Sequence, residues 1–337
     1  MKVSFAVPVY NVEPYIERCA RSLFGQTLDE VEYVFVDDCS LDNSINLLLS
    51  VLEDYPERKP FVKIIRHERN MGISASRRDS YLGTTGDYVI AVDSDDMAEP
   101  TLAEKLYNKA IQTGADMVVC DAYRYKKDCR YPIESAPYGE GENGSAIRDA
   151  IINRVTTPGI WCKLFRRDLF DHDRMVWPKG NYSEDVLISA QCAFYAKKIA
   201  YVEEPLYHYL YNEVSICNKP DPRRREKNVE EYKMNISDLD HFLKEHNVEE
   251  KYWFGLFLNK FYAKKQLLPY VEQVKYRRLW FSTFPELNHT LFWGNTLYKS
   301  SYKQKIWMAA IWLGLYPKFK HRLETKRFCP NNRWRVW

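Results

Sequence analysis

Three carboxylates directly follow an apolar run in the segment Val-Ile-Ala-Val-Asp-Ser-Asp-Asp, residues 89–96. At the end of a buried strand, Asp93, Asp95 and Asp96 would lose solvation and repel one another, so a divalent cation is a natural counter-charge. Carboxylate oxygens suit Mg²⁺ or Mn²⁺. The segment therefore indicates a metal-assisted site. The alternative is a solvated turn that caps a helix beginning near Glu99, because Asp is common at turns and N-caps.

A second acidic strand end occurs at Val36-Asp37-Asp38-Cys39-Ser40. If both acidic ends belong to one parallel sheet, they open onto the same edge, which is where such sheets bind their ligands. We therefore expect the two acidic ends to face one cleft. The alternative is that Asp37 and Asp38 cap a helix starting near Asp42.

A third acidic pair, Glu184-Asp185, follows Asn181-Tyr182-Ser183. One positioned carboxylate is enough to take the proton of an attacking hydroxyl group, so this pair is a candidate general base. Acidic residues are also favoured in the first turn of any helix, and that is the alternative explanation.

Short β-branched runs alternate with amphipathic segments over the first 120 residues. The runs predict strands at 3–7, 31–36, 62–65, 88–92 and 117–120. Apolar stripes predict helices within 15–23, 45–52 and 102–110. This order favours an α/β fold in which helices cover both faces of a mostly parallel sheet.

The pattern weakens after residue 125. Residues 126–144 are polar and rich in Gly, Pro and Glu, and we expect a long surface loop that could act as a lid. Further periodic segments lie at 147–155, 160–165, 184–194 and 199–211, and amphipathic helices are predicted at 232–243, 252–268 and 304–315. We expect a catalytic domain at 1–218, with halves 1–121 and 122–218, and a helical region at 219–337.

Composition narrows the class of protein. The 49 basic and 46 acidic residues give a net charge of +3, too balanced for a nucleic-acid binder. Eight cysteines without metal-like spacing predict reduced thiols and a cytoplasmic protein. No run approaches the roughly 18–20 apolar residues of a membrane span, and the N-terminal apolar run is too short for a signal peptide.

The last 40 residues are basic and aromatic, with ten Lys or Arg residues against one acid, Glu324. This pattern predicts an interfacial helix that brings a cytoplasmic protein to the inner face of the cell membrane through anionic lipid. A helix packed on the domain, or between two copies of the chain, explains the pattern equally well. The oligomeric state stays open.

Four motifs occur together in the order and spacing of the family 2 glycosyltransferases, which the chain therefore resembles. They are Pro8-Val9-Tyr10-Asn11, Val36-Asp37-Asp38-Cys39-Ser40, Asn70-Met71-Gly72 and Asp93-Ser94-Asp95-Asp96. The resemblance continues more loosely through Trp161-Cys162-Lys163-Leu164-Phe165, Glu184-Asp185-Val186 and Tyr207-His208-Tyr209. It implies a GT-A fold and inverting transfer from a nucleotide-diphosphate sugar, by family habit UDP-linked. The implied acceptor is a saccharide or lipid-linked saccharide of a surface-polysaccharide pathway.

The resemblance also implies roles for individual residues. The nucleotide-binding positions are Pro8, Tyr10, Asn11, Asp38, Asn70, Gly72, Arg77, Asp93 and Ser94. Tyr10 would stack on the base while Asp38 accepts its imide N–H, and Gly72 would supply a turn that a side chain obstructs. Arg77 would reach the base or the phosphates, unless it is an exposed helix arginine.

For the reaction itself, the resemblance implies Asp185 as general base with Glu184 as its helper, and Asp95 as ligand of Mn²⁺ or Mg²⁺. His208 is a further candidate metal ligand, although a lone histidine on a strand is commonly a packed polar residue. The candidates on the sugar and acceptor side are Trp161, Lys163 and Asp96. Trp161 could equally be a core residue.

Three other functions have to be weighed. A sugar-1-phosphate nucleotidyltransferase would begin with a Gly-rich loop, which Val7-Pro8-Val9-Tyr10-Asn11 lacks. A non-catalytic member that binds nucleotide or saccharide is disfavoured because each expected catalytic acid is present. A dinucleotide-binding enzyme is disfavoured because no GxGxxG follows the first strand.

Overall fold

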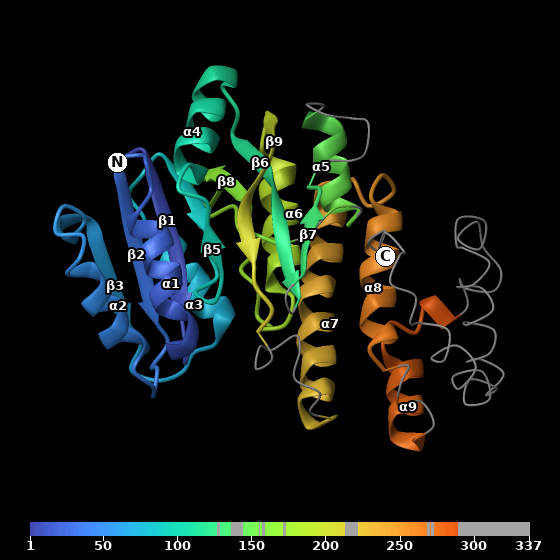
Figure 1. Ribbon diagram of the computed structural model, residues 1–337. Coiled ribbons are helices and arrows are strands. Elements are labelled where there is room, and N and C mark those ends of the chain that lie inside the picture. The colour runs from blue at the N-terminus through green and yellow to red at the C-terminus, as the bar shows by residue number, and fades with distance from the viewer. Residues whose placement is uncertain are drawn as a thin grey trace.

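The computed structural model describes residues 1–288 except 127–128, 136–143, 155, 157–158, 171–172, 213–221, 268–269 and 271–272 (Figure 1). The strands are β1 (Val3–Val9), β2 (Val31–Asp37), β3 (Val62–Arg66), β4 (Tyr88–Ala91), β5 (Met97–Ala98), β6 (Met117–Lys126), β7 (Cys129–Ile133), β8 (Lys163–Arg166) and β9 (Ile199–Tyr209). The helices are α1 (Glu13–Phe24), α2 (Ser44–Leu52), α3 (Ile73–Leu82), α4 (Leu102–Thr113), α5 (Gly144–Ile152), α6 (Glu184–Tyr195), α7 (Pro222–Glu245), α8 (Trp253–Lys265) and α9 (Val274–Ser282). Short 3₁₀ helices lie at Lys59–Phe61 and Arg167–Phe170.

Within these ranges the strands form one sheet in the order β3-β2-β1-β4-β8-β6-β9-β5, with β7 paired to β6. The strands from β3 to β4 are parallel, so the acidic ends of β2 and β4 leave the sheet at the same edge. β8 is antiparallel to both β4 and β6, and β9 returns parallel to β6. This mixed sheet confirms the predicted α/β class.

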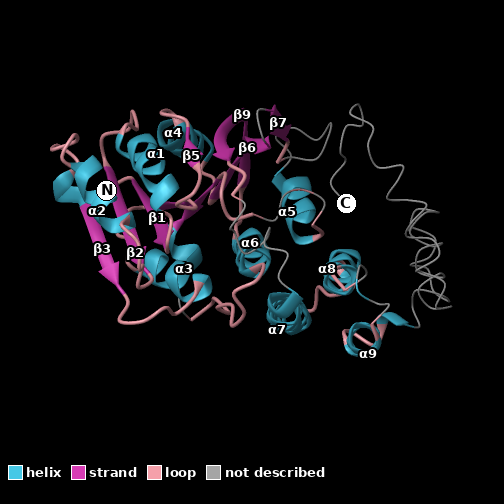
Figure 2. Ribbon diagram, turned by 60° about the horizontal axis from the view of Figure 1, so that its bottom comes forward, coloured by secondary structure: helices cyan, strands magenta, loops and turns pink. Residues whose placement is uncertain are grey.

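Each face of the sheet has its own apolar core, because the strand side chains alternate between the faces. One core packs β-strand residues against α1, α2 and α4. The other packs them against α3, α5 and α6, and extends to α7 and α8. Figure 2 shows α1 and α4 on one side of the strands and α3 and α6 on the other. The helical C-terminal region was also predicted correctly.

Two local predictions were wrong. Residues 129–133, expected in a loop, form β7 and extend β6 into a hairpin. The signal was hidden by Pro132, which an edge strand tolerates because it needs no N–H on its open side. The helix predicted at 232–243 starts ten residues earlier, because α7 begins at Pro222, a residue that suits the first helical position.

Some expectations concern the parts of the chain that the structure does not describe. The helix predicted at 304–315 and the basic tail lie outside the described residues, as do Cys217 and Cys329. The six described cysteines are free thiols. Across the described ranges, the helices are too short or too polar to cross a membrane.

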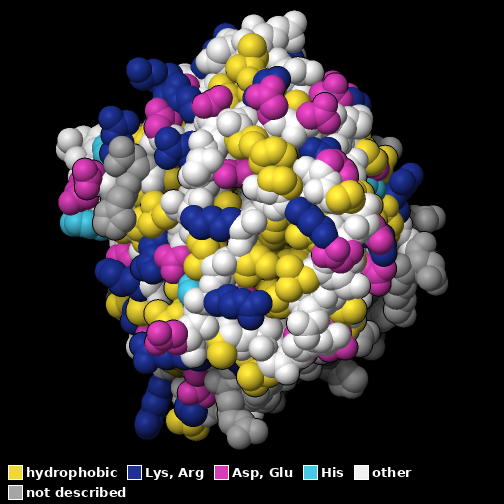
Figure 3. Space-filling model, turned by 90° about the vertical axis from the view of Figure 1, so that its left-hand side faces the viewer, with side chains coloured by type: hydrophobic (Ala, Val, Ile, Leu, Met, Phe, Trp, Pro, Cys, Tyr) yellow, Lys and Arg dark blue, Asp and Glu magenta, His cyan; other side chains and the backbone are white. Residues whose placement is uncertain are grey.

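Strand β3 forms one edge of the sheet, and Lys63 and Arg66 on it are exposed. Figure 3 looks onto this side of the molecule and shows basic side chains around a small apolar patch. Charged side chains on an edge strand disfavour pairing with another sheet. The fold therefore protects this edge without covering it.

We predict that residues 1–218 do not fold without α7. Tyr232, Ile236, Leu239, Phe242 and Leu243 of α7 are at most 1% exposed and belong to the core that covers α6. Burial of each contributes about 1.5–3 kcal/mol, against a total stability of about 5–15 kcal/mol for a typical domain.

A chain ending at residue 220 should therefore lack a cooperative thermal transition and bind a hydrophobic dye. A chain ending after Asn288, which keeps all the described residues of this core, is the matched control. A cooperative transition in the shorter chain at the temperature of the control would contradict the prediction.

Candidate active site

Three aspartates follow β4 at the carboxyl edge of the sheet, and the end of β9 lies against them. Asp96 is 1% exposed, and its carboxylate accepts hydrogen bonds from the Tyr207 hydroxyl group and the Leu210 N–H, both at 2.8 Å. Asp95 accepts one from the Asn212 side-chain amide at 2.8 Å. Tyr207 also accepts from the Asp93 N–H. These partners satisfy the carboxylates by hydrogen bonds without neutralising their charge.

The pKa values of Asp95 and Asp96 reflect the charge that these hydrogen bonds leave in place. Burial and repulsion by Asp95 and Asp93 hold the pKa of Asp96 well above its ordinary value. Burial and repulsion by Asp93 also raise the pKa of Asp95. A nearby cation would reverse both effects. Carboxylate oxygens of this kind are chemically compatible with a hard divalent cation.

The described residues include no group of three or more His, Cys, Asp or Glu side chains that could hold a metal alone. His208, one predicted ligand, has partners on both ring nitrogens: Glu99 at 2.8 Å and the Tyr125 hydroxyl group at 3.0 Å. The metal role predicted for His208 would require one ring nitrogen to give up its partner, while the other could keep its hydrogen bond. An ion at Asp95 would need further ligands from a bound substrate.

Arg77 on α3 connects the acidic edge to the start of α6. Its guanidinium donates to Asp93 Oδ1 through Nη2 and to Glu184 Oε1 through Nε, both at 2.7 Å. The side chain is 6% exposed. The third nitrogen, Nη1, is buried and has no hydrogen-bond partner among the described residues. The exposed-arginine alternative is therefore wrong.

Glu184 and Asp185 form the first turn of α6, which follows Ser183 in the left-handed conformation at φ 56°. Burial raises the pKa of Glu184 to about 7, against the opposing effect of Arg77. Burial likewise raises the pKa of Asp185, while Arg77 and Arg154 oppose that rise. A carboxylate with an elevated pKa near two cations is suited to accept a proton.

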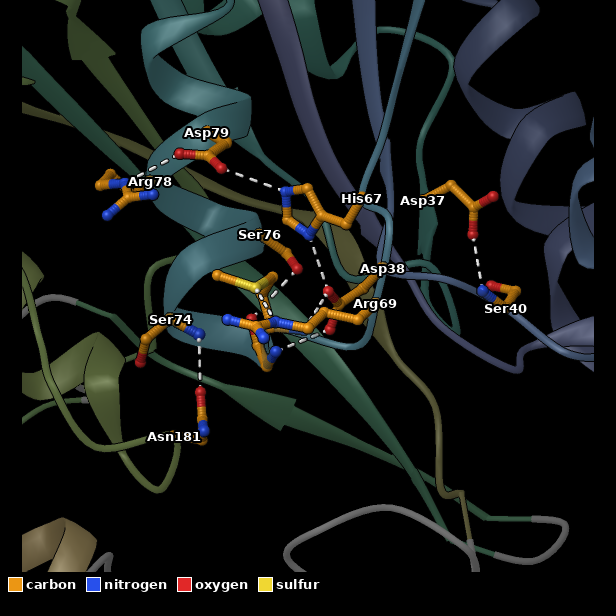
Figure 4. Close-up of polar contacts among 12 residues, drawn as sticks. Asp37, Asp38, Ser40, His67, Arg69, Ser74, Ser76, Arg78, Asp79 and Asn181 are labelled. Atoms are coloured by element: carbon orange, nitrogen blue, oxygen red, sulfur yellow. Dashed lines mark hydrogen bonds and ion pairs between the residues drawn. The ribbon is translucent and has the colours of Figure 1, made fainter.

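Asp38 organises the loop that follows β3 (Figure 4). Its Oδ1 lies 2.7 Å from His67 Nδ1 and accepts from the Met71 N–H at 2.7 Å, while Oδ2 accepts from the Gly72 N–H at 2.8 Å. His67 Nε2 lies 3.1 Å from Asp79 on α3. In this structure Asp38 therefore fixes the 67–72 loop, a role that the sequence did not reveal.

The end of β1 lies beside the end of β2. Tyr10 is 43% exposed, and Asn11 links the two ends by accepting from the Leu41 N–H at 2.8 Å and donating its own N–H to Ser40 Oγ at 3.3 Å. Of the other predicted nucleotide-binding residues, Pro8 and Ser94 are buried and Asn70 is exposed. The exposed tyrosine ring is the group available for stacking.

Trp161 and Lys163, predicted on the acceptor side, are buried. Trp161 is 8% exposed and stacks on Tyr207 and Tyr209, with both pairs of ring centroids 5.2 Å apart. Lys163 is 1% exposed and its ammonium group donates to the Gly159 carbonyl oxygen. Trp161 supports the strand end that carries Tyr207, and Lys163 holds the segment before β8. Little of either surface is open to a sugar.

Several residues of the site were missed from the sequence. His67 directly follows β3, at the same sheet edge as the Asp37-Asp38 pair. A histidine at the edge that carries an acidic pair was the available signal. Asn212 follows the Tyr207-His208-Tyr209 motif and was not singled out from the sequence. Arg154, which donates to Asn259 at 2.8 Å and lies 4.2 Å from the ring of Tyr262, left no local signal.

A scan against protein-family models matches residues 4–173 to Glycosyl transferase family 2. Among curated proteins, the chain is similar to the putative glycosyltransferase EpsH of Bacillus subtilis. The two are 30% identical over 256 residues, which cover 74% of this chain and 71% of EpsH.

Two solved structures share the fold. The crystal structure of S. aureus TarS 1-349 in complex with UDP-GlcNAc has a TM-score of 0.70 at 18% identity, over 97% of this chain and 92% of that one. The mannosyltransferase PcManGT from Pyrobaculum calidifontis, in complex with GDP-Man and Mn2+, has a TM-score of 0.52 at 15% identity, over 93% of this chain and 86% of that one. The predicted resemblance in fold is confirmed.

Replacing Arg77 tests how far the site depends on its two buried ion pairs. Arg77→Met would leave Asp93 and Glu184 without their counter-charge, and we predict a loss of about 3–5 kcal/mol in the free energy of unfolding. Urea-induced unfolding measures it. Arg78→Met is the matched control, since Arg78 is 41% exposed and pairs with Asp79, so its loss should cost about 0–1 kcal/mol. Equal losses in the two variants would contradict the prediction.

Proposed function

The chain belongs to glycosyl transferase family 2 and is a glycosyltransferase, and on that premise we propose that it transfers a sugar from a UDP-sugar with inversion at the anomeric carbon. A divalent metal ion at Asp95 assists the transfer, and Asp185 is the general base. The acceptor is a saccharide or lipid-linked saccharide.

One observation carries this proposal. The Arg77 guanidinium holds Asp93 of the acidic edge and Glu184, the neighbour of Asp185, at 2.7 Å each. A donor diphosphate near Asp93 and an acceptor hydroxyl group near Asp185 would therefore meet in one cleft. Such an arrangement is what direct displacement requires, since the reacting groups must be held together.

The end of β1 and the Asp38 loop support a pyrimidine donor. The exposed Tyr10 ring offers a face for the base. A carboxylate has about four acceptor positions, and Asp38 uses three of them for His67, Met71 and Gly72, which leaves one for an imide N–H. The UDP-GlcNAc bound by TarS, a protein of similar fold, agrees with uracil as the base.

The raised pKa values of Asp95 and Asp96 support a metal ion at this edge. Asp95 would be its protein ligand, and the donor diphosphate would supply other ligands. When bound, the ion would stabilise the negative charge that develops on the departing diphosphate. The Mn2+ in the PcManGT complex agrees with such a site, and both Mn²⁺ and Mg²⁺ accept these ligands.

In the reaction, the acceptor hydroxyl oxygen forms a bond to the anomeric carbon as the bond from that carbon to the diphosphate oxygen breaks. The hydroxyl proton passes to the Asp185 carboxylate, and the nucleoside diphosphate leaves. Arg77 orients Glu184 beside the base and Asp93 beside the donor. We assign no second carboxylate as nucleophile, so a single displacement inverts the configuration.

The acceptor and the cellular location are inferred from the sequence of the tail. The basic and aromatic sequence of the last 40 residues favours an anionic membrane surface and hence a lipid-linked acceptor. We infer a cytoplasmic protein that is peripheral on the inner face of the membrane and belongs to a surface-polysaccharide pathway.

Nucleotide binding tests the donor site. Thermal unfolding with a panel of nucleoside diphosphates, with and without Mn²⁺, should show metal-dependent stabilisation by UDP, because binding to the folded state raises its stability. Asp95→Asn should lose most of the metal-dependent stabilisation, because the variant replaces a charged carboxylate ligand by a neutral amide. Asp54→Asn, a change at an exposed acid that pairs with Arg21 far from this edge in sequence, is the control. Absence of stabilisation by every nucleotide would refute the donor assignment.

The pH dependence tests the base. The pKa of Asp185 is raised by burial, so the carboxylate becomes ionised only above the ordinary aspartate pKa of about 4. Activity should therefore fall as pH drops through a value above 4, and kcat measured against pH would locate it. Asp185→Asn should abolish transfer while UDP binding persists. An acid limb at or below pH 4, or substantial transfer by the variant, would exclude Asp185 as the base.

A further inference from the structure

The N-cap position of helix α3 is Gly72, which has no side chain to cap the helix. The first N–H groups of any helix lack partners within it and need an acceptor from elsewhere. At Ser74 that acceptor is Asn181, whose Oδ1 lies 3.1 Å from the Ser74 nitrogen (Figure 4). The Ser74 hydroxyl group donates to the Gly180 carbonyl oxygen at 2.7 Å. The segment before α6 thus caps α3 from outside.

This contact is close-packed as well as polar. Gly72 has φ 89°, and a Cβ atom placed there would overlap the side chain of Asn181. The N–H groups of Met71 and Gly72 are held by Asp38 on the other side. The 70–72 loop therefore lies between Asp38 and Asn181 and contacts both.

The segment that carries Asn181 is itself anchored to α7. Asn235 is fully buried, and its side-chain amide accepts from the Gly180 N–H at 3.0 Å and donates to the carbonyl oxygens of Gly180 and Tyr182 at 2.9 and 3.1 Å. Two residues after Tyr182, Glu184 and Asp185 begin α6. The anchor thus fixes the approach to the acidic pair.

We propose that Asn181 is a positioning residue that couples the 70–72 loop to the Glu184-Asp185 turn, so that donor binding and placement of the base depend on one another. The inference rests on the proposed function in that the loop binds the donor and Asp185 is the base. It adds a second connection between the two halves of the site, beside the ion pairs of Arg77. Asn235 extends the coupling to the C-terminal helices.

Three single variants test the coupling. Asn181→Ala removes the cap of α3, and Asn181→Asp restores an acceptor, since Asp and Asn cap helices equally well. Asn153→Ala is the matched control, because Asn153 Oδ1 accepts from the Gly255 N–H at 3.1 Å and caps α8 in the same way, away from the donor loop. The readouts are the Kd for UDP, kcat, and backbone hydrogen exchange of segments 67–76 and 177–186.

We expect Asn181→Ala to raise the Kd for UDP about fivefold, which corresponds to the loss of one helix cap of about 1 kcal/mol. Its kcat should fall as well, because the turn that holds Asp185 loosens. Exchange should accelerate in both segments. Asn181→Asp should return all three readouts towards the native values, and Asn153→Ala should lower thermal stability without changing them.

The proposal is overturned if Asn181→Ala loses stability as the control does but keeps the native Kd and kcat, or if exchange accelerates in segment 177–186 alone. Failure of the proposed function has a different signature: the native protein would neither bind UDP nor turn over a donor. In that case hydrogen exchange of Asn181→Ala still tests the coupling. Faster exchange in both segments supports it, and unchanged exchange in segment 67–76 refutes it.

Discussion

The guanidinium of Arg77 lies between two carboxylates, one beside the parallel half of the sheet and one on a helix that covers the mixed half. The site is arranged around this guanidinium. Asp93 comes from the parallel half and Glu184 from the helix that covers the mixed half, each 2.7 Å from Arg77. A charge buried this deeply is tolerated only when it is paired, because desolvation costs several kcal/mol for each ion. Helices α3 and α6, which pack in the same core, must therefore close around Arg77 together. Helices α3 and α6 have their places set by this requirement as much as by apolar packing.

A second group of contacts lets the sheet bury acidic residues without neutralising them. Tyr207, Leu210 and Asn212 at the end of β9 give hydrogen bonds to Asp95 and Asp96, so the carboxylates keep their geometry while their pKa values stay raised. Under the proposed metal role, a site built in this way would have little to rearrange when a cation binds. Trp161, stacked on Tyr207, belongs to this support.

The sequence predicted what depends on local pattern and little of what depends on distant contacts. Strand ends at Asp37 and Asp93 follow from short apolar runs, so the acidic edge could be located. The Arg77–Glu184 pair and the Ser74–Asn181 bond each join residues 107 positions apart, and no periodicity reports such a contact. Strand β7 was missed because pairing with β6, and not the propensity of Cys-Arg-Tyr-Pro-Ile, makes it a strand. For the same reason burial of Trp161 and Lys163 could not be read from their motif.

The late position of β9 in the chain has a consequence for biosynthesis. Asp95 and Asp96 obtain their partners from residues 111 to 117 positions further along. At about 5–20 residues per second, the ribosome adds that stretch in roughly 6–23 s. Throughout this interval the residues of the first four strands have been synthesised, while their acidic ends are still hydrated and open to solution. In a nascent chain the carboxylates of Asp95 and Asp96 are therefore hydrated well before the site forms. The site is completed in one of the last steps of the sheet's assembly.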